Sequence, residues 1–482
     1  MADYNRHHIG EVNPLKQQIY NPYLTPWEYI PDAEPRVFGD RLYIFGSHDR
    51  FGGKWYCEND YVTWSAPLSD LSDWRYEGVI FAKEQDKRKG NLYAPDVVQG
   101  LDGRFYLYYS KDDTSVIGVA VSDTPAGKYE FLGEVHYPDG NVLGDSEGEY
   151  FMFDPSVLID DGRIWLYSGS SQRGTTTKVK RNMAGCTVAE LEPDMMTVKQ
   201  PPKVILPGTK SWNTTAYFEG PSARKIGELY YVVYPVRNGS GLHYATSKYP
   251  NRDFTPQGRI HSTSDFGING HSFWNLAYPA GNNHGGLVEL NGQWYIFDHR
   301  MTHRTSFSRQ GVAEPVTIAP DGSIRQAEST SCGLNGKPLI GEGVYPAYIA
   351  CNLMGRKFLG KLRIPGKQPY ITQSGKDGDE DADFYIAGMK NGYTAGYKYF
   401  DFAGGNYQIV VTYRGHSGRL GLALQEDGQT IGSADLSQSD TWREATVSCY
   451  IPKGKHPLFF TYHGKTSIDL LQFEIKNTEE TI

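Results

Sequence analysis

Short apolar runs alternate with polar turns along this chain, in a unit that recurs five times. In the clearest copy, Asp154 begins a short apolar run, the turn Asp160-Asp161-Gly162 follows, and a second apolar run, RIWLYSGS, comes next. The other four copies have their turns at residues 39–40, 102–103, 227–228 and 291–292. Asp-Gly and Asn-Gly between aromatic and β-branched runs indicate β-hairpins, because these residues tolerate the positive φ that a tight turn requires.

The five hairpins predict a β-propeller. Two strands cannot bury an apolar face alone, and β-units repeating about every 60 residues are typical of blades around a channel. The inner strand of each blade faces the axis, so we expect the polar residue that starts each unit to point there. These residues are Asp32, Asp96, Asp154, Glu219 and His284. Any one of them could be a turn former, but gathering like charges is costly, which favours a functional site.

The pattern changes near residue 365. A polar, Gly-rich stretch, RIPGKQPYITQSGKDGDEDAD, is followed by short alternating runs with Gly and Asp turns, which is typical of a β-sandwich. A chain of 482 residues is also long for one domain. We therefore expect an all-β protein with a five-bladed propeller over 1–325, a connecting segment over 326–365 and a jelly-roll-like sandwich over 366–482.

The amino-acid composition limits the classes of binding partner and the cellular compartment that we expect. The 35 Tyr and 9 Trp suit β-strands and sugar-stacking surfaces, while the net charge of −8 comes without a basic patch, which argues against nucleic acid. No apolar segment is long enough for a membrane helix, and no secretory signal is apparent. The five scattered cysteines favour a reducing compartment. We expect a cytoplasmic protein, or a secreted one if a signal was trimmed; the oligomeric state is not predicted.

Motifs in successive blades resemble glycoside hydrolase family 43 over about residues 20–325. Phe153-Asp154-Pro155-Ser156 and Glu219-Gly220-Pro221 match intact, and Tyr93-Ala94-Pro95 stands where the family has W-A-P. Ile30-Pro31-Asp32-Ala33-Glu34-Pro35 departs from H-P-D-P, since it lacks the His and carries extra residues. His284 in NHGGLVEL resembles the channel histidine. The stretch GYKYFDFAGGNYQIVV is similar to a family 6-type carbohydrate-binding sandwich.

The resemblance implies inverting glycoside hydrolysis by paired carboxyl groups. We assign Asp32 as general base and Glu219 as general acid, and the aromatic residues around Glu219 suit an acid that stays protonated near neutral pH. Asp154 is expected to position Glu219 and to raise its pKa.

The other candidates keep two readings each. Asp96 is either a ligand for a substrate hydroxyl or a structural carboxylate. Arg309 either reaches the pocket or forms a surface salt bridge. His284 either holds water or a structural calcium ion in the channel, or is a satisfied core histidine. Trp212 and Trp74, with Trp27 and Trp274 behind them, are candidates for stacking on a sugar, of which we expect one.

The function expected is an exo-acting glycosidase that removes α-L-arabinofuranosyl or β-D-xylosyl residues from arabinoxylan or its oligosaccharides. Its partners would be plant cell-wall oligosaccharides or polysaccharides, and catalysis would need no cofactor. The alternatives are a galactan-directed glycosidase and a non-catalytic carbohydrate-binding propeller. The sandwich is expected to be structural or weakly binding.

Overall fold

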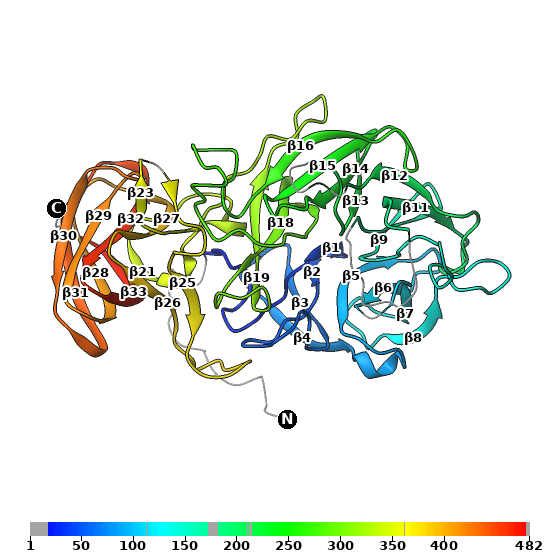
Figure 1. Cartoon of the computed structure of the whole chain (residues 1–482), viewed down its shortest axis with the longest axis horizontal. Coiled ribbons are helices and arrows are strands. Elements are labelled where there is room, and N and C mark those ends of the chain that lie inside the picture. Colours follow the sequence, from blue (N-terminus) through cyan, green and yellow to red (C-terminus); the bar gives the residue numbers. More distant parts are fainter. Residues whose placement is uncertain are drawn as a thin grey trace.

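The computed structural model describes residues 18–112, 114–171, 182–209, 211, 215–360 and 362–478. Over these ranges the chain consists of β-strands and loops, with three short 3₁₀ helices: η2 (Lys83–Gln85), η3 (Gly333–Asn335) and η4 (Ala347–Ile349). Figure 1 shows a ring of small sheets beside a two-layered domain. The described part of the chain contains no helix long and apolar enough to cross a membrane.

Five antiparallel sheets form the blades of the predicted propeller (Figure 1). The first two comprise β1 (Glu34–Phe38), β2 (Arg41–Phe45), β3 (Tyr61–Pro67) and β4 (Arg75–Phe81), then β5 (Leu92–Gln99), β6 (Phe105–Lys111), β7 (Gly118–Ser122) and β8 (Glu130–Glu134). The next two comprise β9 (Ser156–Asp160), β10 (Arg163–Ser168), β11 (Gly185–Leu191) and β12 (Lys203–Pro207), then β13 (Ser222–Ile226), β14 (Leu229–Pro235), β15 (Leu242–Ser247) and β16 (Thr255–His261). The fifth has three strands, β17 (Leu287–Leu290), β18 (Gln293–Met301) and β19 (Arg309–Val316).

All five predicted hairpins are present as the two inner strands of the blades. The ring closes between blades one and five. There Ala33 forms a bridge with Gly285, and Tyr23 packs against Phe297 with ring centroids 5.1 Å apart. Asn21 donates its side-chain N–H to the carbonyl oxygen of Ala313 at 3.1 Å. The segment before blade one therefore joins the first and last blades.

The second domain is the predicted β-sandwich of two six-stranded sheets. One sheet contains β20 (Leu339–Ile340), β22 (Asn352–Met354), β27 (Tyr393–Phe402), β29 (Gly418–Ala423), β30 (Thr430–Leu436) and β32 (Gly454–Gly464). The other contains β21 (Gly343–Pro346), β25 (Tyr370–Gln373), β26 (Phe384–Lys390), β28 (Gly405–Gly415), β31 (Ser439–Ile451) and β33 (Ser467–Asn477). A separate hairpin joins β23 (Lys357–Leu359) to β24 (Leu362–Arg363).

The sandwich begins before the predicted boundary. Strands β20 to β22 lie in the predicted connecting segment 326–365, and their Leu339, Tyr345 and Leu353 are buried in the sandwich core. These strands have two to four residues each, too few to show the alternation from which the sequence predicts a strand.

Buried charges join the two domains. The Lys398 ammonium, on β27, lies 2.7 Å from a carboxylate oxygen of Asp265 and 3.0 Å from one of Glu328. Asp265 belongs to the propeller and Glu328 to the segment that follows its last blade, and Lys398 is only 4% exposed. Removing one partner of such a buried pair leaves an uncompensated charge, so the contact ties the domains firmly.

Candidate active site

The inner strands bring several predicted residues to one end of the channel. Asp32, Asp154 and His284 each lie six residues before the last paired residue of their inner strand. Gly220 holds that position in blade four, directly after Glu219. Asp32, Asp154 and Gly220 share a left-handed backbone, with φ of 58°, 49° and 54°. The same local turn therefore presents a carboxyl group in three blades.

The three acids lie close enough to control one another's protonation. Burial and then the negative charge of Asp32 raise the pKa of Glu219, the charges of Arg309 and Arg237 oppose this rise, and the resulting pKa is about 8. Burial, then the charges of Glu219 and Asp32, raise the pKa of Asp154 well above its usual value. One buried oxygen of Asp154 and one of Glu219 have no hydrogen-bond partner among the described residues. The arrangement therefore holds a proton on the Asp154 and Glu219 pair near neutral pH.

Asp32 is tuned in the opposite direction. Burial alone would raise its pKa, but Arg309, His299 and His284 lower it below the ordinary value. The Arg309 guanidinium donates to both Asp32 oxygens, at 3.0 and 3.2 Å. The backbone N–H of Asp32 also donates to Nδ1 of His299 at 3.2 Å. Asp32 is therefore held as a carboxylate.

Arg309 is buried against the predicted base Asp32 and does not form a surface salt bridge, and a residue that the sequence analysis missed holds it there. Asp49 accepts two parallel hydrogen bonds from the guanidinium, from Nε and from Nη2, each at 2.8 Å. Asp49 is fully buried in the loop between β2 and β3. Such a bidentate pair fixes the plane of the guanidinium. The only sequence feature that could have pointed to Asp49 is the polar run that follows the apolar strand β2.

Aromatic side chains from the loops surround this charged cluster. Tyr56 lies under Arg309, with the guanidinium carbon 5.0 Å from the ring centroid, and contacts Phe307 edge-on at 4.7 Å. Trp55 stacks on the same Phe307 at 6.0 Å and is 48% exposed. Tyr93 and Phe153 pack at 5.6 Å on the side of blades two and three. Trp55 and Tyr56 were also missed, since their position depends on loop conformation.

Asp96 does not belong to this group. It lies three residues before the last paired residue of β5, after a shift in register between Tyr93 and Asp96. Its oxygens accept hydrogen bonds from Arg36, at 2.5 and 2.9 Å, and from the backbone N–H of Val157 at 2.7 Å. Asp96 has no exposed surface. It fits the structural reading, and its prediction as a substrate ligand is corrected.

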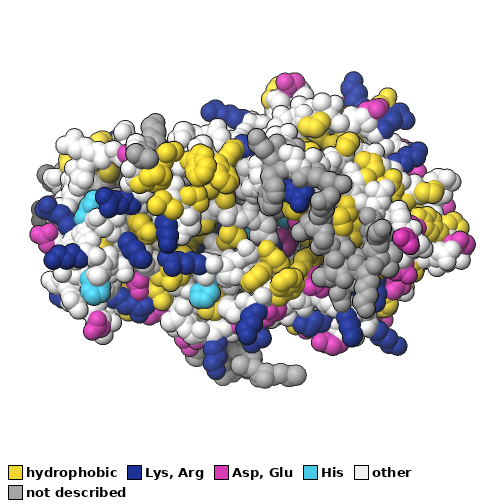
Figure 2. Space-filling view, in the orientation of Figure 1, with side chains coloured by type: hydrophobic (Ala, Val, Ile, Leu, Met, Phe, Trp, Pro, Cys, Tyr) yellow, Lys and Arg dark blue, Asp and Glu magenta, His cyan; other side chains and the backbone are white. Residues whose placement is uncertain are grey.

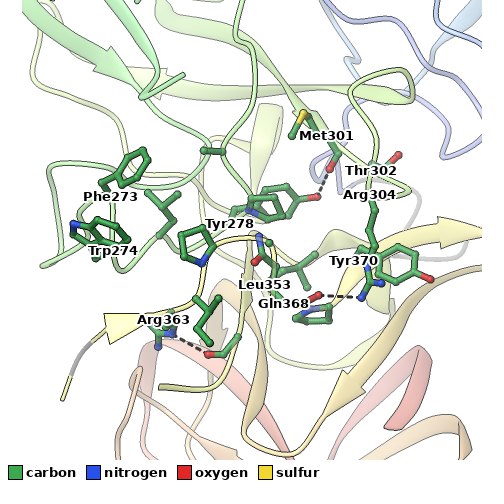
Figure 3. A pocket seen from close by; sticks show the side chains of 18 of the residues that line it. Phe273, Trp274, Tyr278, Met301, Thr302, Arg304, Leu353, Arg363, Gln368 and Tyr370 are labelled. Atoms are coloured by element: carbon green, nitrogen blue, oxygen red, sulfur yellow. Dashed lines mark hydrogen bonds between the residues drawn. The ribbon is translucent and has the colours of Figure 1, made fainter. Parts of the chain in front are cut away.

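The tryptophan predictions also change. Trp74 packs against Tyr23, with ring centroids 5.8 Å apart, at the core between blades one and five, so it is not a stacking platform. Trp212 lies outside the described residues. Trp274 is 57% exposed and lines, with Phe273, a pocket of about 330 Å³ between the propeller and the sandwich (Figure 3). Figure 2 shows hydrophobic side chains gathered over this region of the surface.

His284 lies where the resemblance placed it. It contributes to the low pKa of Asp32, and its Nδ1 lies 2.9 Å from where a Cβ on Gly220 would stand. Its Nε2 is buried with no partner among the described residues. Calcium takes roughly six to eight oxygen ligands, and the described chain holds no cluster of three or more ligating His, Cys, Asp or Glu side chains. The residues thus do not fit a directly bound ion; a water-mediated one stays a prediction.

Comparisons with known proteins agree with this geometry. The profile of the glycosyl hydrolases family 43 matches residues 30–324. The chain is 46% identical over 477 residues to a xylosidase/arabinosidase from Thermoclostridium stercorarium, covering 96% of this chain and 99% of that protein.

Two solved structures share the fold. An arabinoxylan arabinofuranohydrolase from Bacillus subtilis, in complex with cellotetraose, superposes with a TM-score of 0.52 at 20% identity and covers 96% of this chain and 99% of its own. A β-xylosidase/α-arabinofuranosidase from a compost metagenome, in complex with xylotriose, has a TM-score of 0.51 at 25% identity and covers 64% and 97%. The chain belongs to glycosyl hydrolase family 43.

Proposed function

We propose that the protein is an exo-acting, inverting glycosidase that removes α-L-arabinofuranosyl or β-D-xylosyl residues from arabinoxylan or its oligosaccharides. One observation carries the proposal: two carboxyl groups at the end of one channel are tuned in opposite directions. Arg309 helps to hold Asp32 charged, while burial and the charge of Asp32 keep Glu219 protonated. Such a split in pKa is what assigns a base and an acid.

In the proposed mechanism, a water molecule next to Asp32 attacks the anomeric carbon. Asp32 takes one proton from this water as the new C–O bond forms. Glu219 gives its proton to the leaving oxygen as the glycosidic C–O bond breaks. Asp154, whose own pKa is raised by burial and by the charge of Glu219, shares a proton with that acid, and we assign it to positioning Glu219. No step needs a cofactor.

The sugar assignment rests on the whole-length relative. Its 46% identity to a xylosidase/arabinosidase supports a pentose substrate over the galactan-directed alternative. The presence of a tuned base and acid supports catalysis over the non-catalytic binding propeller. The similarity of the sandwich to a family 6-type carbohydrate-binding domain belongs to the same proposal, and retardation of the full-length Asp32→Ala protein on a xylan-containing gel would support a binding role.

The test is an assay of the wild type, Asp32→Ala and Glu219→Ala on p-nitrophenyl α-L-arabinofuranoside and β-D-xyloside. We expect the wild type to release nitrophenol, with activity falling as the pH rises through about 8 because Glu219 loses its proton. Asp32→Ala should be inactive. Glu219→Ala should keep part of its activity, because nitrophenol leaves without protonation. A wild type inert on both substrates, or an active Asp32→Ala, would overturn the proposal.

Inversion is tested separately by proton NMR of the first product. The anomer released in the first minutes should have the configuration opposite to that of the substrate. Retention would require a nucleophile in place of the proposed water, and would contradict the role of Asp32 as a base.

A further inference from the structure

The C-terminal sandwich contacts the two loops that carry the base and its partners. Strand β25, at the edge of its sandwich sheet, and the turn that follows it, residues 370–383, lie against the propeller. In Figure 1 this hairpin extends toward the loop between β2 and β3. Its Asp377 accepts hydrogen bonds from the backbone N–H of Phe51, at 2.7 Å, and from the side chain of Asn59, at 3.1 Å. Both donors belong to the loop that contains Asp49.

These contacts continue to the base without a gap. The same Asn59 nitrogen that donates to Asp377 also donates to the backbone oxygen of Asp49, at 3.1 Å. The Asp49 carboxylate holds the Arg309 guanidinium with two bonds of 2.8 Å. Arg309 in turn holds Asp32 at 3.0 Å. A chain of hydrogen bonds thus connects the sandwich to the proposed general base.

Two further hydrogen bonds from strand β25 support this series of hydrogen bonds. The side-chain oxygen of Gln373 accepts a hydrogen bond from the Tyr29 hydroxyl at 2.5 Å. The carbonyl oxygen of Tyr29 accepts a hydrogen bond from the backbone N–H of Asp49 at 2.9 Å. On the other side, Ile371 accepts the backbone N–H of His303 at 2.7 Å, in the loop that leads to Arg309. Hydrogen bonds from the sandwich therefore hold both the loop that carries Asp49 and the loop that leads to Arg309.

We propose that residues 370–383 of the sandwich contribute to the active site. Asp377 is a positioning residue for the ion pairs that link Asp49, Arg309 and Asp32. The inference rests on the proposed role of Asp32 as the base. Asp377 touches neither the acids nor the pocket aromatics; it acts through Asn59 and the backbone of Phe51. Displacing a catalytic group by a fraction of an ångström lowers the rate, and side chains on loops keep their geometry only when neighbouring groups fix them.

The test compares Asp377→Ala with Asp377→Asn and with Asp381→Ala. Asp381 is an exposed acid of the same turn, and its side chain takes no part in the hydrogen bonds described above. The full-length variants are assayed on the better nitrophenyl substrate across pH, and their thermal unfolding is recorded. Asp377→Ala should lower kcat about tenfold with a smaller change in KM. Because Arg309 would hold Asp32 less well, the acid limb of kcat/KM should also move to higher pH.

The conservative variant sets the scale. Asp377→Asn has one oxygen and can accept from only one of the two donors, so its kcat should fall between those of the wild type and Asp377→Ala. Asp381→Ala should behave as the wild type. If Asp377→Ala keeps the wild-type kcat and acid limb, or only unfolds at lower temperature, the positioning role is overturned. If Asp32→Ala is active, the proposed function has failed instead, so the two failures are distinguishable.

Discussion

Blades two and three begin with an aspartate near the channel, and the two aspartates have opposite surroundings. Asp96 is saturated by the guanidinium of Arg36 and by backbone and hydroxyl donors. Asp154 has an oxygen without a partner among the described residues, and it lies beside two other carboxyl groups. A buried charge with all its partners supports the fold, whereas an unsatisfied one is costly unless it serves another purpose. The partners of a buried acid, more than its place in a repeat, thus indicate its role.

The largest effect should come from Asp154→Asn. This change removes a charge that shares a proton with Glu219, so the acid should be both less well placed and easier to ionise. We expect kcat to fall about 10³-fold on a substrate with a poor leaving group, within the range for loss of acid catalysis. The basic limb of the pH profile should move to lower pH.

The matched measurement is thermal unfolding of the same protein. Since Asp154 forms no ion pair with a cation among the residues that the structure describes, Asp154→Asn should unfold at or above the wild-type temperature. A clear loss of stability would show that Asp154 is as structural as Asp96, and the comparison between the two blades would fail.

The opposite result is expected for Asp96→Leu. Its loss leaves the buried Arg36 without its hydrogen-bonded ion-pair partner, which should cost about 3–5 kcal/mol of the free energy of unfolding. The folded fraction should keep kcat within about twofold of the wild type, because Asp96 lies apart from the catalytic group. Chemical denaturation and an active-site-normalised assay measure both quantities.

A double variant provides the control. Asp96→Leu combined with Arg36→Met removes both charges and should regain part of the lost stability, since no charge is left buried alone. A variant of Asp96 that folds as well as the wild type but loses activity would restore its reading as a substrate ligand.

A smaller effect should follow from Arg309→Lys. Lysine keeps the charge but loses the planar fork that holds Asp49 with two bonds and Asp32 with a third nitrogen. The pKa of Asp32 should therefore rise, and the acid limb of kcat/KM should move to higher pH with about a tenfold loss at the optimum. An unchanged acid limb would mean that Arg309 does not set the charge of Asp32.

The sequence could predict the hairpins because their turns are local. It could also predict that Asp32, Asp154 and Glu219 lie together, because the motif of each comes just before an inner strand. It could not decide between the two readings of Asp96, because the shift in register after Tyr93 leaves no mark in the order of residues. Asp49 could not be predicted, since its partner Arg309 lies 260 positions away and meets it only when the ring closes.

The smallest effect concerns the stability cost of the catalytic acid. The pKa of Glu219 is about 8 in the folded protein, against an ordinary value near 4.5. Between these two pH values the folded state binds a proton that the unfolded chain has released, so the wild type loses stability as the pH rises through this window.

Glu219→Gln has no such proton. Its Tm should match the wild type near pH 4 and exceed it by about 4 °C near pH 8. The exposed Glu228→Gln, in the turn of the same blade, should show no difference that grows with pH. If Glu219→Gln instead unfolds at lower temperature at pH 8, the carboxyl group stabilises the fold, and the contrast between paired and unpaired acids would not extend to Glu219.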